Sequence, residues 1–320
     1  MYELKSYAKI NLGLEIIGKR SNGYHNLKTI FQTVDFFDTI HIKENTSGEI
    51  RLKGDDSSIE WDERNTIVKA FEKIYGNYSV KGGFDIFVEK HIPSGAGLGG
   101  GSINAAVILL FLERFFNLSI PANDMNEMAV QIGADVPFFL TGGTALAEGI
   151  GEKITPLEDI EEFDCDIVIP GIKVITKHIF SNFILTSTPI ISKIDTFINS
   201  GKKKILVNNL EKATFELFPE VEIVKNKMKK FGYELVLMSG SGSSVYGITD
   251  KKDSSAIETD RLNRYSVLSN EFSGSRVVIT RTIDRNSYRK NIGASPSGKA
   301  SVFGADTRRF ESSRPSLYIK

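Results

Sequence analysis

The sequence contains a single cysteine, Cys165, among its 320 residues. One cysteine permits no disulfide within the chain, which is typical of proteins kept in a reducing compartment. Long hydrophobic runs are also absent, because the longest, residues 105–112 (AAVILLFL), is far shorter than the ~20 residues of a membrane helix. The first residues alternate in polarity and include Glu3 and Lys5, unlike a signal peptide. We therefore expect a cytoplasmic protein with no membrane segment.

The chain also lacks a net charge, since 40 Lys and Arg residues balance 40 Asp and Glu residues. Residues 286–320 hold seven of the basic and two of the acidic residues, so residues 1–285 are acidic overall. An acidic body argues against a nucleic-acid partner, whose usual footprint is a basic stripe. Hydrophobic residues make up 41% of a chain long enough for two domains, so we expect a well-buried core.

Local patterns indicate a mixture of strands and helices. Residues 2–17 alternate in polarity, which predicts a half-buried strand with Lys9 and Asn11 together on the polar face. A long helix is predicted at 209–231, and strands are predicted on both sides of the Gly/Ser turn at 239–244. These elements favour an α+β fold.

The glycine-rich stretch at residues 93–101 (PSGAGLGGG) follows a predicted strand and precedes a predicted helix. Glycines allow close approach of backbone N–H groups, and a helix N-terminus favours anions, so this loop is typical of phosphate binding. It fits the dinucleotide pattern Gly95-x-Gly97-x-x-Gly100, but the acidic residue expected about 20 positions later is missing. A Walker A loop is excluded because Gly-Gly-Ser replaces its Gly-Lys-Ser/Thr ending.

Four further segments complete a pattern. They are AKINL at 8–12, GYH at 23–25, GADVPFF at 133–139 and the Gly/Ser turn at 239–244. With the glycine loop extended to 93–106, the sequence resembles the GHMP kinase superfamily. It is most similar to the branch that phosphorylates a cytidine-diphosphate-linked polyol in isoprenoid precursor synthesis. The similarity covers about residues 4–283.

The resemblance implies a two-domain α+β GHMP kinase fold, with an ATP-binding domain at 1–155 and a C-terminal domain at 156–285. The active site would lie in the cleft between them. The implied partners are ATP, used with Mg²⁺, and a CDP-linked polyol, in a monomer or homodimer. The widely spaced histidines predict no metal site in the protein itself.

The resemblance also assigns residues. Asp135 would be the base that takes the proton of the acceptor hydroxyl, and Lys9 would orient it. ATP binding is assigned to Pro93, Ser94, Gly95, Ala96, Gly97, Leu98, Gly99, Gly100, Gly101, Ser102 and Ile103. Substrate binding is assigned to Asn11, Tyr24, His25, Thr176, Phe180, Gly240 and Gly242. Ile103 stands where the family commonly has a second Ser or Thr, so an Mg²⁺ role there would pass to Ser102, water or ATP.

Plainer interpretations stay open. Asp135 follows a helix-ending glycine and would cap a turn, and Lys9 would be a solvated strand residue. The chain would then be a nucleotide-binding protein without catalysis, or else a GHMP kinase for another small alcohol such as homoserine or a mevalonate.

The last 35 residues, 286–320, are basic and have no periodic apolar pattern, so we expect a disordered tail outside the family. Two origins are open. The segment RFES at 309–312 fits a reading frame running through a tRNA gene, whereas a selected basic arm would contact RNA or an acidic partner.

Overall fold

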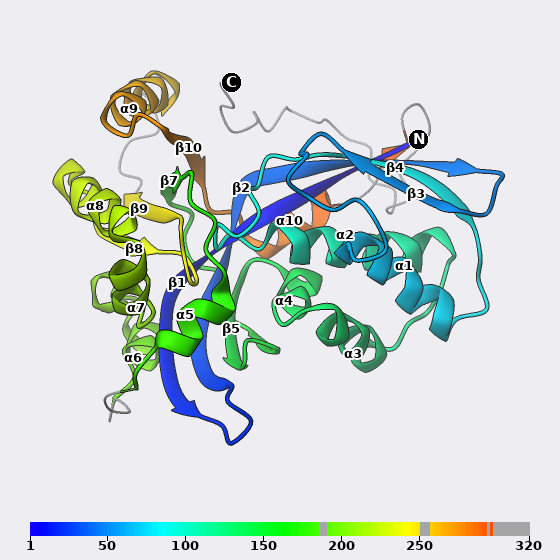
Figure 1. The fold of residues 1–320 in the computed structure, drawn as a ribbon, viewed down its shortest axis with the longest axis horizontal. Coiled ribbons are helices and arrows are strands. Elements are labelled where there is room, and N and C mark those ends of the chain that lie inside the picture. Colours follow the sequence, from blue (N-terminus) through cyan, green and yellow to red (C-terminus); the bar gives the residue numbers. More distant parts are fainter. Residues whose placement is uncertain (186–190, 250–256, 293–294, 297–320) are drawn as a thin grey trace.

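A computed structural model describes residues 1–185, 191–249, 257–292 and 295–296, and it contains two sheets (Figure 1). The larger sheet has seven strands, in the order β11-β1-β2-β4-β3, with β5 paired to β2 and β6 paired to β5. The smaller sheet has the order β10-β7-β9-β8. Among the described residues, no helix has the length and hydropathy needed to cross a membrane.

The elements fall into two sets by sheet. The larger sheet contains β1 (Tyr2–Lys19), β2 (His25–Asn45), β3 (Ile50–Gly54), β4 (Gly83–Glu89), β5 (Thr144–Gly149), β6 (Lys153–Pro156) and β11 (Ser295–Pro296). Its helices are α1 (Thr66–Asn77), α2 (Gly100–Phe115), α3 (Ala122–Ile132), α4 (Val136–Thr141) and α10 (Arg285–Asn291). The smaller sheet contains β7 (Asp164–Pro170), β8 (Leu235–Met238), β9 (Val245–Thr249) and β10 (Ser275–Arg281). The helices that follow β7 are α5 (Thr176–Asn182), α6 (Lys193–Ser200), α7 (Glu211–Leu217), α8 (Pro219–Met228) and α9 (Ile257–Glu271), with short 3₁₀ turns η1 (Lys203–Ile205) and η2 (Lys229–Phe231).

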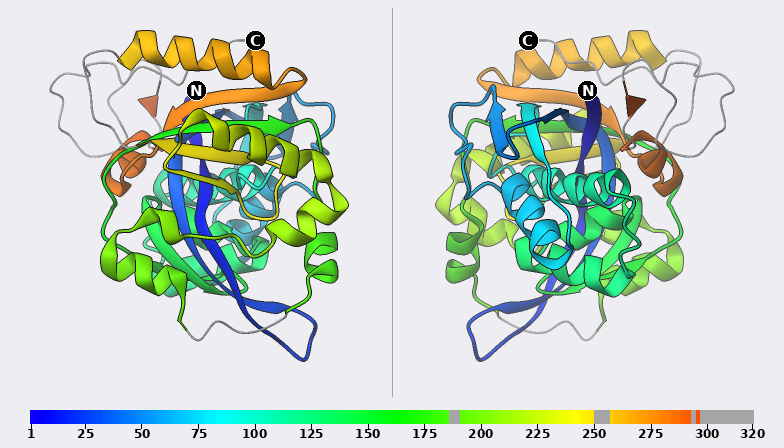
Figure 2. Two further views of the ribbon diagram at one scale, coloured as in Figure 1. Left: turned by 90° about the vertical axis from the view of Figure 1, so that its left-hand side faces the viewer. Right: turned by 90° about the vertical axis from the view of Figure 1, so that its right-hand side faces the viewer.

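The two sets meet along β1. Figure 1 shows α1 to α4 below the larger sheet at one end of the molecule and the smaller sheet with its helices at the other. The two side views in Figure 2 show the long β1–β2 pair crossing the molecule from top to bottom. The predicted boundary at residue 155 falls near the end of β6 and stays a prediction.

Strand β1 is buried on both faces from residue 6 to residue 16, so the predicted half-buried strand is wrong. The second face is covered by the C-terminal half of the chain. A Cβ on Gly13 would lie 2.9 Å from Leu206, and the Tyr246 hydroxyl donates to the Asn11 carbonyl at 2.8 Å. The polar face of β1, with Lys9 and Asn11, is therefore enclosed between the two halves.

The single helix expected at 209–231 is two helices, α7 and α8, because Pro219 interrupts it. A proline has no N–H to donate, and it holds the preceding residue away from helical geometry. Phe218 accordingly has φ −136° and ψ 76°, and Pro219 begins α8. The break turns the chain, so that α7 lies beside the Gly/Ser turn.

Residues 286–292 of the expected disordered tail are ordered, which corrects the prediction for this segment. Tyr288 in α10 is fully buried, its ring packs against Gly142, and its hydroxyl donates to the Phe139 carbonyl. Ile292 is also buried, and β11 pairs with the start of β1. One aromatic and one aliphatic side chain therefore anchor 286–292 without any periodic pattern. Residues 297–320 lie outside the described residues.

Candidate active site

The glycine loop between β4 and α2 has three residues in the left-handed region. Gly95, Gly97 and Gly99 have φ values of 72°, 78° and 77°. Space also excludes side chains, because a Cβ on Gly97 would lie 2.1 Å from the Ser239 carbonyl oxygen. Gly99 is the N-cap of α2 and supplies no side-chain cap, so the first turn of α2 points its N–H groups out of the helix end.

The carbonyl groups of this loop are bound within the protein. The carbonyls of Gly95, Ala96 and Gly97 accept hydrogen bonds from Val174 N (3.2 Å), Ser244 N (3.2 Å) and Ser239 Oγ (2.8 Å). The Leu98 carbonyl accepts from Lys9 N at 3.1 Å. We call this set of four bonds the loop clamp. Because it directs the carbonyl oxygens into the protein, it reduces their repulsion of a bound phosphate.

The side chains of the predicted ATP-binding segment divide into two groups. Ala96, Leu98 and Ile103 are buried in the core, so these three residues can face a ligand only through their backbone. Pro93, Ser94, Gly101 and Ser102 retain exposed surface. The departure at Ile103 thus places a core side chain at that position, and Ser102 carries the hydroxyl in the first turn of α2.

Lys9 and Asp135 come together across the interior. Lys9 Nζ lies 3.6 Å from Asp135 Oδ2, donates to Asn11 Oδ1 at 2.6 Å, and sits 4.8 Å from the centre of the Phe31 ring. Burial lowers the pKa of the Lys9 ammonium, and the Asp135 carboxylate opposes that shift. The predicted neighbourhood of Lys9 and Asp135 is therefore present, with Lys9 enclosed and Asp135 one-third exposed.

The plainer interpretation of Asp135 disagrees with this geometry. Asp135 is the N-cap residue of α4, but its side chain makes no capping hydrogen bond. A Cβ on Gly151 would lie 3.7 Å from Asp135 Oδ1, so the carboxylate borders the turn after β5. Its oxygens thus lie between Lys9 and the turn after β5, whose Ile150 lines a neighbouring cavity.

That cavity has a volume of about 770 Å³ and opens beside Ala134 and Ile150. Its lining brings together four residues that the sequence assigned to substrate, namely Tyr24, His25, Thr176 and Phe180. The ring centres of His25 and Phe180 are 5.6 Å apart at an interplanar angle of 32°. Tyr24 is 59% exposed, which leaves its ring available at the cavity mouth.

His25 is prepared for a polar ligand. The imidazole is buried, and neither ring nitrogen has a hydrogen-bond partner among the described residues. Burial lowers the pKa of His25, and the positive charge of Lys19 lowers it further, so the ring is neutral at pH 7. A neutral imidazole offers one donor and one acceptor, and a buried imidazole without partners favours a ligand that supplies both.

Two lysines that were not among the predicted site residues, Lys19 and Lys177, also line this cavity. Neither ammonium has an ion-pair partner in the part of the chain that the structure describes, and the lining contains no Asp or Glu. No sequence motif marks these lysines, because Lys19 reaches the cavity from the end of β1 and Lys177 from α5. The cavity therefore combines an aromatic slot with a positive rim.

Three remaining predicted residues lie deeper. Asn11 is 2% exposed, and a Cβ on Gly240 would lie 3.4 Å from Asn11 Oδ1. A Cβ on Gly242 would instead meet Met238 Sδ at 2.8 Å, inside the C-terminal half. Gly240 thus borders the Lys9 environment, whereas Gly242 shapes the turn and lies away from the cavity lining.

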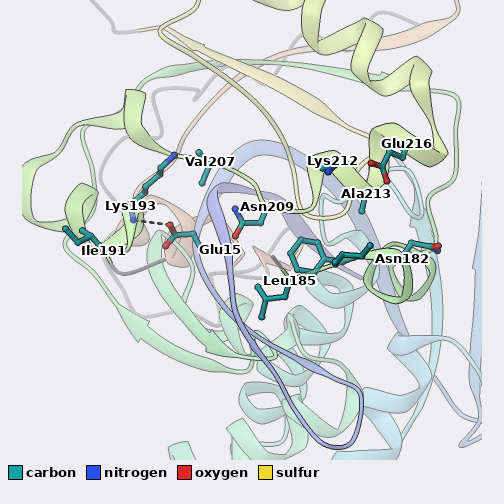
Figure 3. A pocket seen from close by; sticks show the side chains of 12 residues that line it. Glu15, Asn182, Leu185, Ile191, Lys193, Val207, Asn209, Lys212, Ala213 and Glu216 are labelled. Atoms are coloured by element: carbon teal, nitrogen blue, oxygen red, sulfur yellow. Dashed lines mark hydrogen bonds between the residues drawn. The ribbon is translucent and has the colours of Figure 1, made fainter. Parts of the chain in front are cut away.

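A second cavity, of about 440 Å³, lies farther along the C-terminal half (Figure 3). Its lining includes Glu15, whose carboxylate accepts from Ser192 Oγ at 2.5 Å and from Lys193 N at 3.0 Å. These bonds occupy Glu15 in capping the start of α6. We therefore take the cavity beside Lys9 and Asp135 as the candidate active site.

No group of three or more His, Cys, Asp or Glu residues suited to a metal occurs within the described residues. A cation held by protein side chains alone does not fit this donor set. Ser102, on the first turn of α2, supplies one hydroxyl oxygen, which lies 3.8 Å from the position of a Cβ on Gly133. Such a sparse set suits Mg²⁺, which keeps several waters and is commonly bound through substrate phosphates.

Comparisons with known proteins agree with this geometry. Residues 65–143 match the GHMP kinases N terminal domain and residues 198–266 match the GHMP kinases C terminal domain. A 4-diphosphocytidyl-2-C-methyl-D-erythritol kinase of Clostridium beijerinckii is 40% identical over 78% of this chain and 91% of its own length. The chain belongs to this family of GHMP kinases. It is an ATP-dependent small-molecule kinase.

Other family members match over nearly their whole length. The Clostridium perfringens kinase of the same name is 35% identical over 89% of this chain and 99% of its own. A crystal structure of a 4-(cytidine 5'-diphospho)-2C-methyl-D-erythritol kinase has 30% identity and a TM-score of 0.72, and the match covers 88% of this chain and 99% of that one. A homoserine kinase from Cytophaga hutchinsonii is 17% identical with a TM-score of 0.65, a likeness of fold alone. The predicted GHMP kinase fold is confirmed.

Proposed function

We propose that this kinase transfers the γ-phosphoryl group of ATP to the 2-hydroxyl of 4-diphosphocytidyl-2-C-methyl-D-erythritol. The observation that supports this substrate is that the glycine loop, the Lys9–Asp135 pair and the aromatic cavity adjoin one another. Lys9 contacts the glycine loop through the Leu98 carbonyl, and Asp135 directly follows Ala134 in the wall of the cavity that holds His25 and Phe180. A phosphate donor on the loop and a cytidine in the aromatic slot would thus meet at the Lys9–Asp135 pair.

Each part of the acceptor has a matching surface. Neutral His25 supplies the donor and acceptor that a cytosine edge needs, and Phe180 and Tyr24 supply ring faces for stacking. Lys19 and Lys177 place positive charge where the diphosphate would lie. Thr176 is held by a hydrogen bond between its Oγ1 and Ser241 Oγ at 2.9 Å, which orients the start of α5 beside the slot.

The chemistry follows from charge. Asp135 accepts the proton of the attacking hydroxyl, and Lys9 provides positive charge for the phosphoryl group in transfer. The N–H groups at the start of α2 and in the glycine loop bind the ATP phosphates. Mg²⁺ would enter with ATP and be held by phosphate oxygens with Ser102 and water, where it would neutralise negative charge. A cytoplasmic location and a monomeric or homodimeric state stay predictions.

A coupled ADP-release assay tests the substrate. We expect turnover with 4-diphosphocytidyl-2-C-methyl-D-erythritol and none above background with homoserine or mevalonate. Activity on homoserine or mevalonate alone would replace the proposed acceptor, and ATP binding without turnover on any acceptor would favour a protein that has lost catalysis.

Replacing Lys177 with Met tests the positive rim separately. We expect calorimetry to give an affinity for CDP about fivefold weaker, with an unchanged affinity for cytidine, because an exposed ion pair contributes up to about 1 kcal/mol. Lys28→Met is the matched control, since Lys28 Nζ pairs with Asp195 at 2.6 Å and does not line the cavity. Equal losses for CDP and cytidine would show that Lys177 acts on the base side of the ligand.

A further inference from the structure

Thr29 on β2 is a buried threonine whose hydroxyl has a single available proton. Its Oγ1 donates that proton to the Gly13 carbonyl at 2.6 Å, and the side chain is 1% exposed. The same oxygen lies 2.8 Å from Asn11 Nδ2. Because its proton is committed to Gly13, the Thr29 oxygen can only accept from Asn11, and the amide must present its NH₂ group to Thr29.

This constraint fixes the other end of the amide. With Nδ2 facing Thr29, Asn11 Oδ1 faces Lys9 Nζ at 2.6 Å. A lysine ammonium can only donate, so the opposite amide orientation would place two donors against each other. The backbone of Asn11 is held as well, because Asn11 N donates to Ser239 Oγ at 3.3 Å. The direction of one hydroxyl proton is thus transmitted over two hydrogen bonds to the catalytic lysine.

We propose that Thr29 is a positioning residue for phosphoryl transfer, which fixes the Asn11 amide so that the Lys9 ammonium is directed at Asp135. The inference rests on the proposed function for its kinetic consequence. Thr29 does not line the cavity, and its hydroxyl bonds Gly13 and Asn11, so it acts on Lys9 through Asn11.

The surroundings of Lys9 show why it depends on Asn11 Oδ1 as a hydrogen-bond acceptor. Lys9 is buried, which lowers its pKa. Among the described residues, the negative charge of Asp135 opposes this shift and raises the pKa of Lys9. The Phe31 ring contributes a face from β2, and Asn11 Oδ1 is the nearest oxygen, at 2.6 Å compared with 3.6 Å for Asp135. Loss of the Asn11 acceptor therefore leaves the ammonium with one longer contact in a low-dielectric site.

Thr29→Val keeps the shape of the side chain and removes the hydroxyl, so the Asn11 amide loses the acceptor of its NH₂ group and is free to move away from Lys9. We expect kcat to fall about 10- to 100-fold, with the KM values for both substrates within about threefold of wild type, because only the reacting groups are misaligned. We also expect the alkaline limb of the kcat–pH profile to move down by about one pH unit, since the charged form of Lys9 loses a hydrogen-bond acceptor.

Two further variants separate positioning from stability. Thr29→Ser restores the hydroxyl and is expected to restore the wild-type alkaline limb, even where loss of the methyl group lowers the melting temperature. Thr282→Val removes another buried hydroxyl, which accepts from Phe163 N at 3.1 Å in the C-terminal half, and is expected to lower stability without moving the limb. The proposal would be overturned if the alkaline limb of the kcat–pH profile did not move in Thr29→Val, or if it moved equally in Thr282→Val.

A second measurement does not depend on the acceptor. In protein labelled with ¹³C-lysine, the Lys9 Cε resonance is assigned by its absence in Lys9→Met and followed by NMR as pH is raised. We expect its titration to occur about one pH unit lower in Thr29→Val than in wild type or Thr29→Ser. If the Lys9 titration is unchanged in Thr29→Val, the role of Thr29 is contradicted. If the titration shifts as expected but the wild-type enzyme does not turn over the cytidine diphosphate acceptor, only the proposed function is contradicted.

Discussion

Asp135→Asn is expected to lower kcat by at least about 100-fold, the usual contribution of general-base catalysis, while ATP binding changes little. The amide has nearly the same shape as the carboxylate but cannot accept the proton of the hydroxyl. Little structural damage is expected, because Asp135 makes no capping bond and its side chain is one-third exposed. The coupled ADP-release assay measures kcat, and calorimetry with a non-hydrolysable ATP analogue measures binding.

Asp159→Asn is a useful comparison for this variant. Asp159 is another carboxylate, in the loop between β6 and β7. It accepts from Thr144 N at 2.8 Å and lies outside the lining of the active-site cavity. We expect Asp159→Asn to cost stability and spare kcat. Full turnover by Asp135→Asn would remove Asp135 from the mechanism, and a selective loss of ATP affinity would move it to the donor side.

Gly99→Ala is expected to reduce kcat/KM for ATP about 100-fold, the cost of displacing reacting groups by roughly 1 Å. A Cβ there would lie 2.7 Å from Phe139 Cζ and 3.3 Å from Lys9 Cγ. Relief of these contacts moves the N-cap of α2, the loop and the stem of Lys9 together. We therefore expect weaker ATP binding in calorimetry together with a lower kcat, and not a pure loss of affinity.

The matched control for Gly99 is Gly232→Ala. Gly232 has φ 76°, almost the same as the 77° of Gly99, but nothing lies within 4 Å of an added Cβ. Both substitutions carry the left-handed strain of roughly 1–2 kcal/mol, and only Gly99→Ala carries the contacts. Wild-type kinetics in Gly232→Ala are expected, and wild-type ATP affinity in Gly99→Ala would mean that the loop does not bind the phosphates.

Local chemistry made part of this molecule predictable from its sequence. In the glycine loop, three alternate positions adopt a positive φ that favours glycine, so the run of glycines predicts the loop structure. Lys9 and Asp135 were identified only through the family resemblance, because nothing local brings together residues 126 positions apart. The structure adds the distance between Lys9 and Asp135, the burial of Lys9, and the Asn11 amide that connects Lys9 to Thr29.

Other features depend on tertiary packing that no local pattern encodes. The alternation of β1 indicated a solvated polar face, but the C-terminal half covers that face and encloses Lys9. Tyr288 was predicted to lie in a disordered tail, because a single buried aromatic residue produces no periodic apolar pattern in the sequence. Lys19 and Lys177 joined the substrate cavity from two separate elements, so neither stood out in the sequence.

The loop clamp has a consequence for how such a chain can be rearranged by recombination. Three of its four donors, on Val174, Ser239 and Ser244, come from the C-terminal half, although the carbonyls they satisfy belong to the nucleotide loop. A fragment that kept only the first half would leave three carbonyls without these donors, at about 1–3 kcal/mol for each that stayed buried. Exchange of one half for that of a distant relative would therefore preserve the nucleotide loop only if the incoming turn carried donors at the same places. The two halves must therefore be exchanged together for the nucleotide loop to keep its geometry.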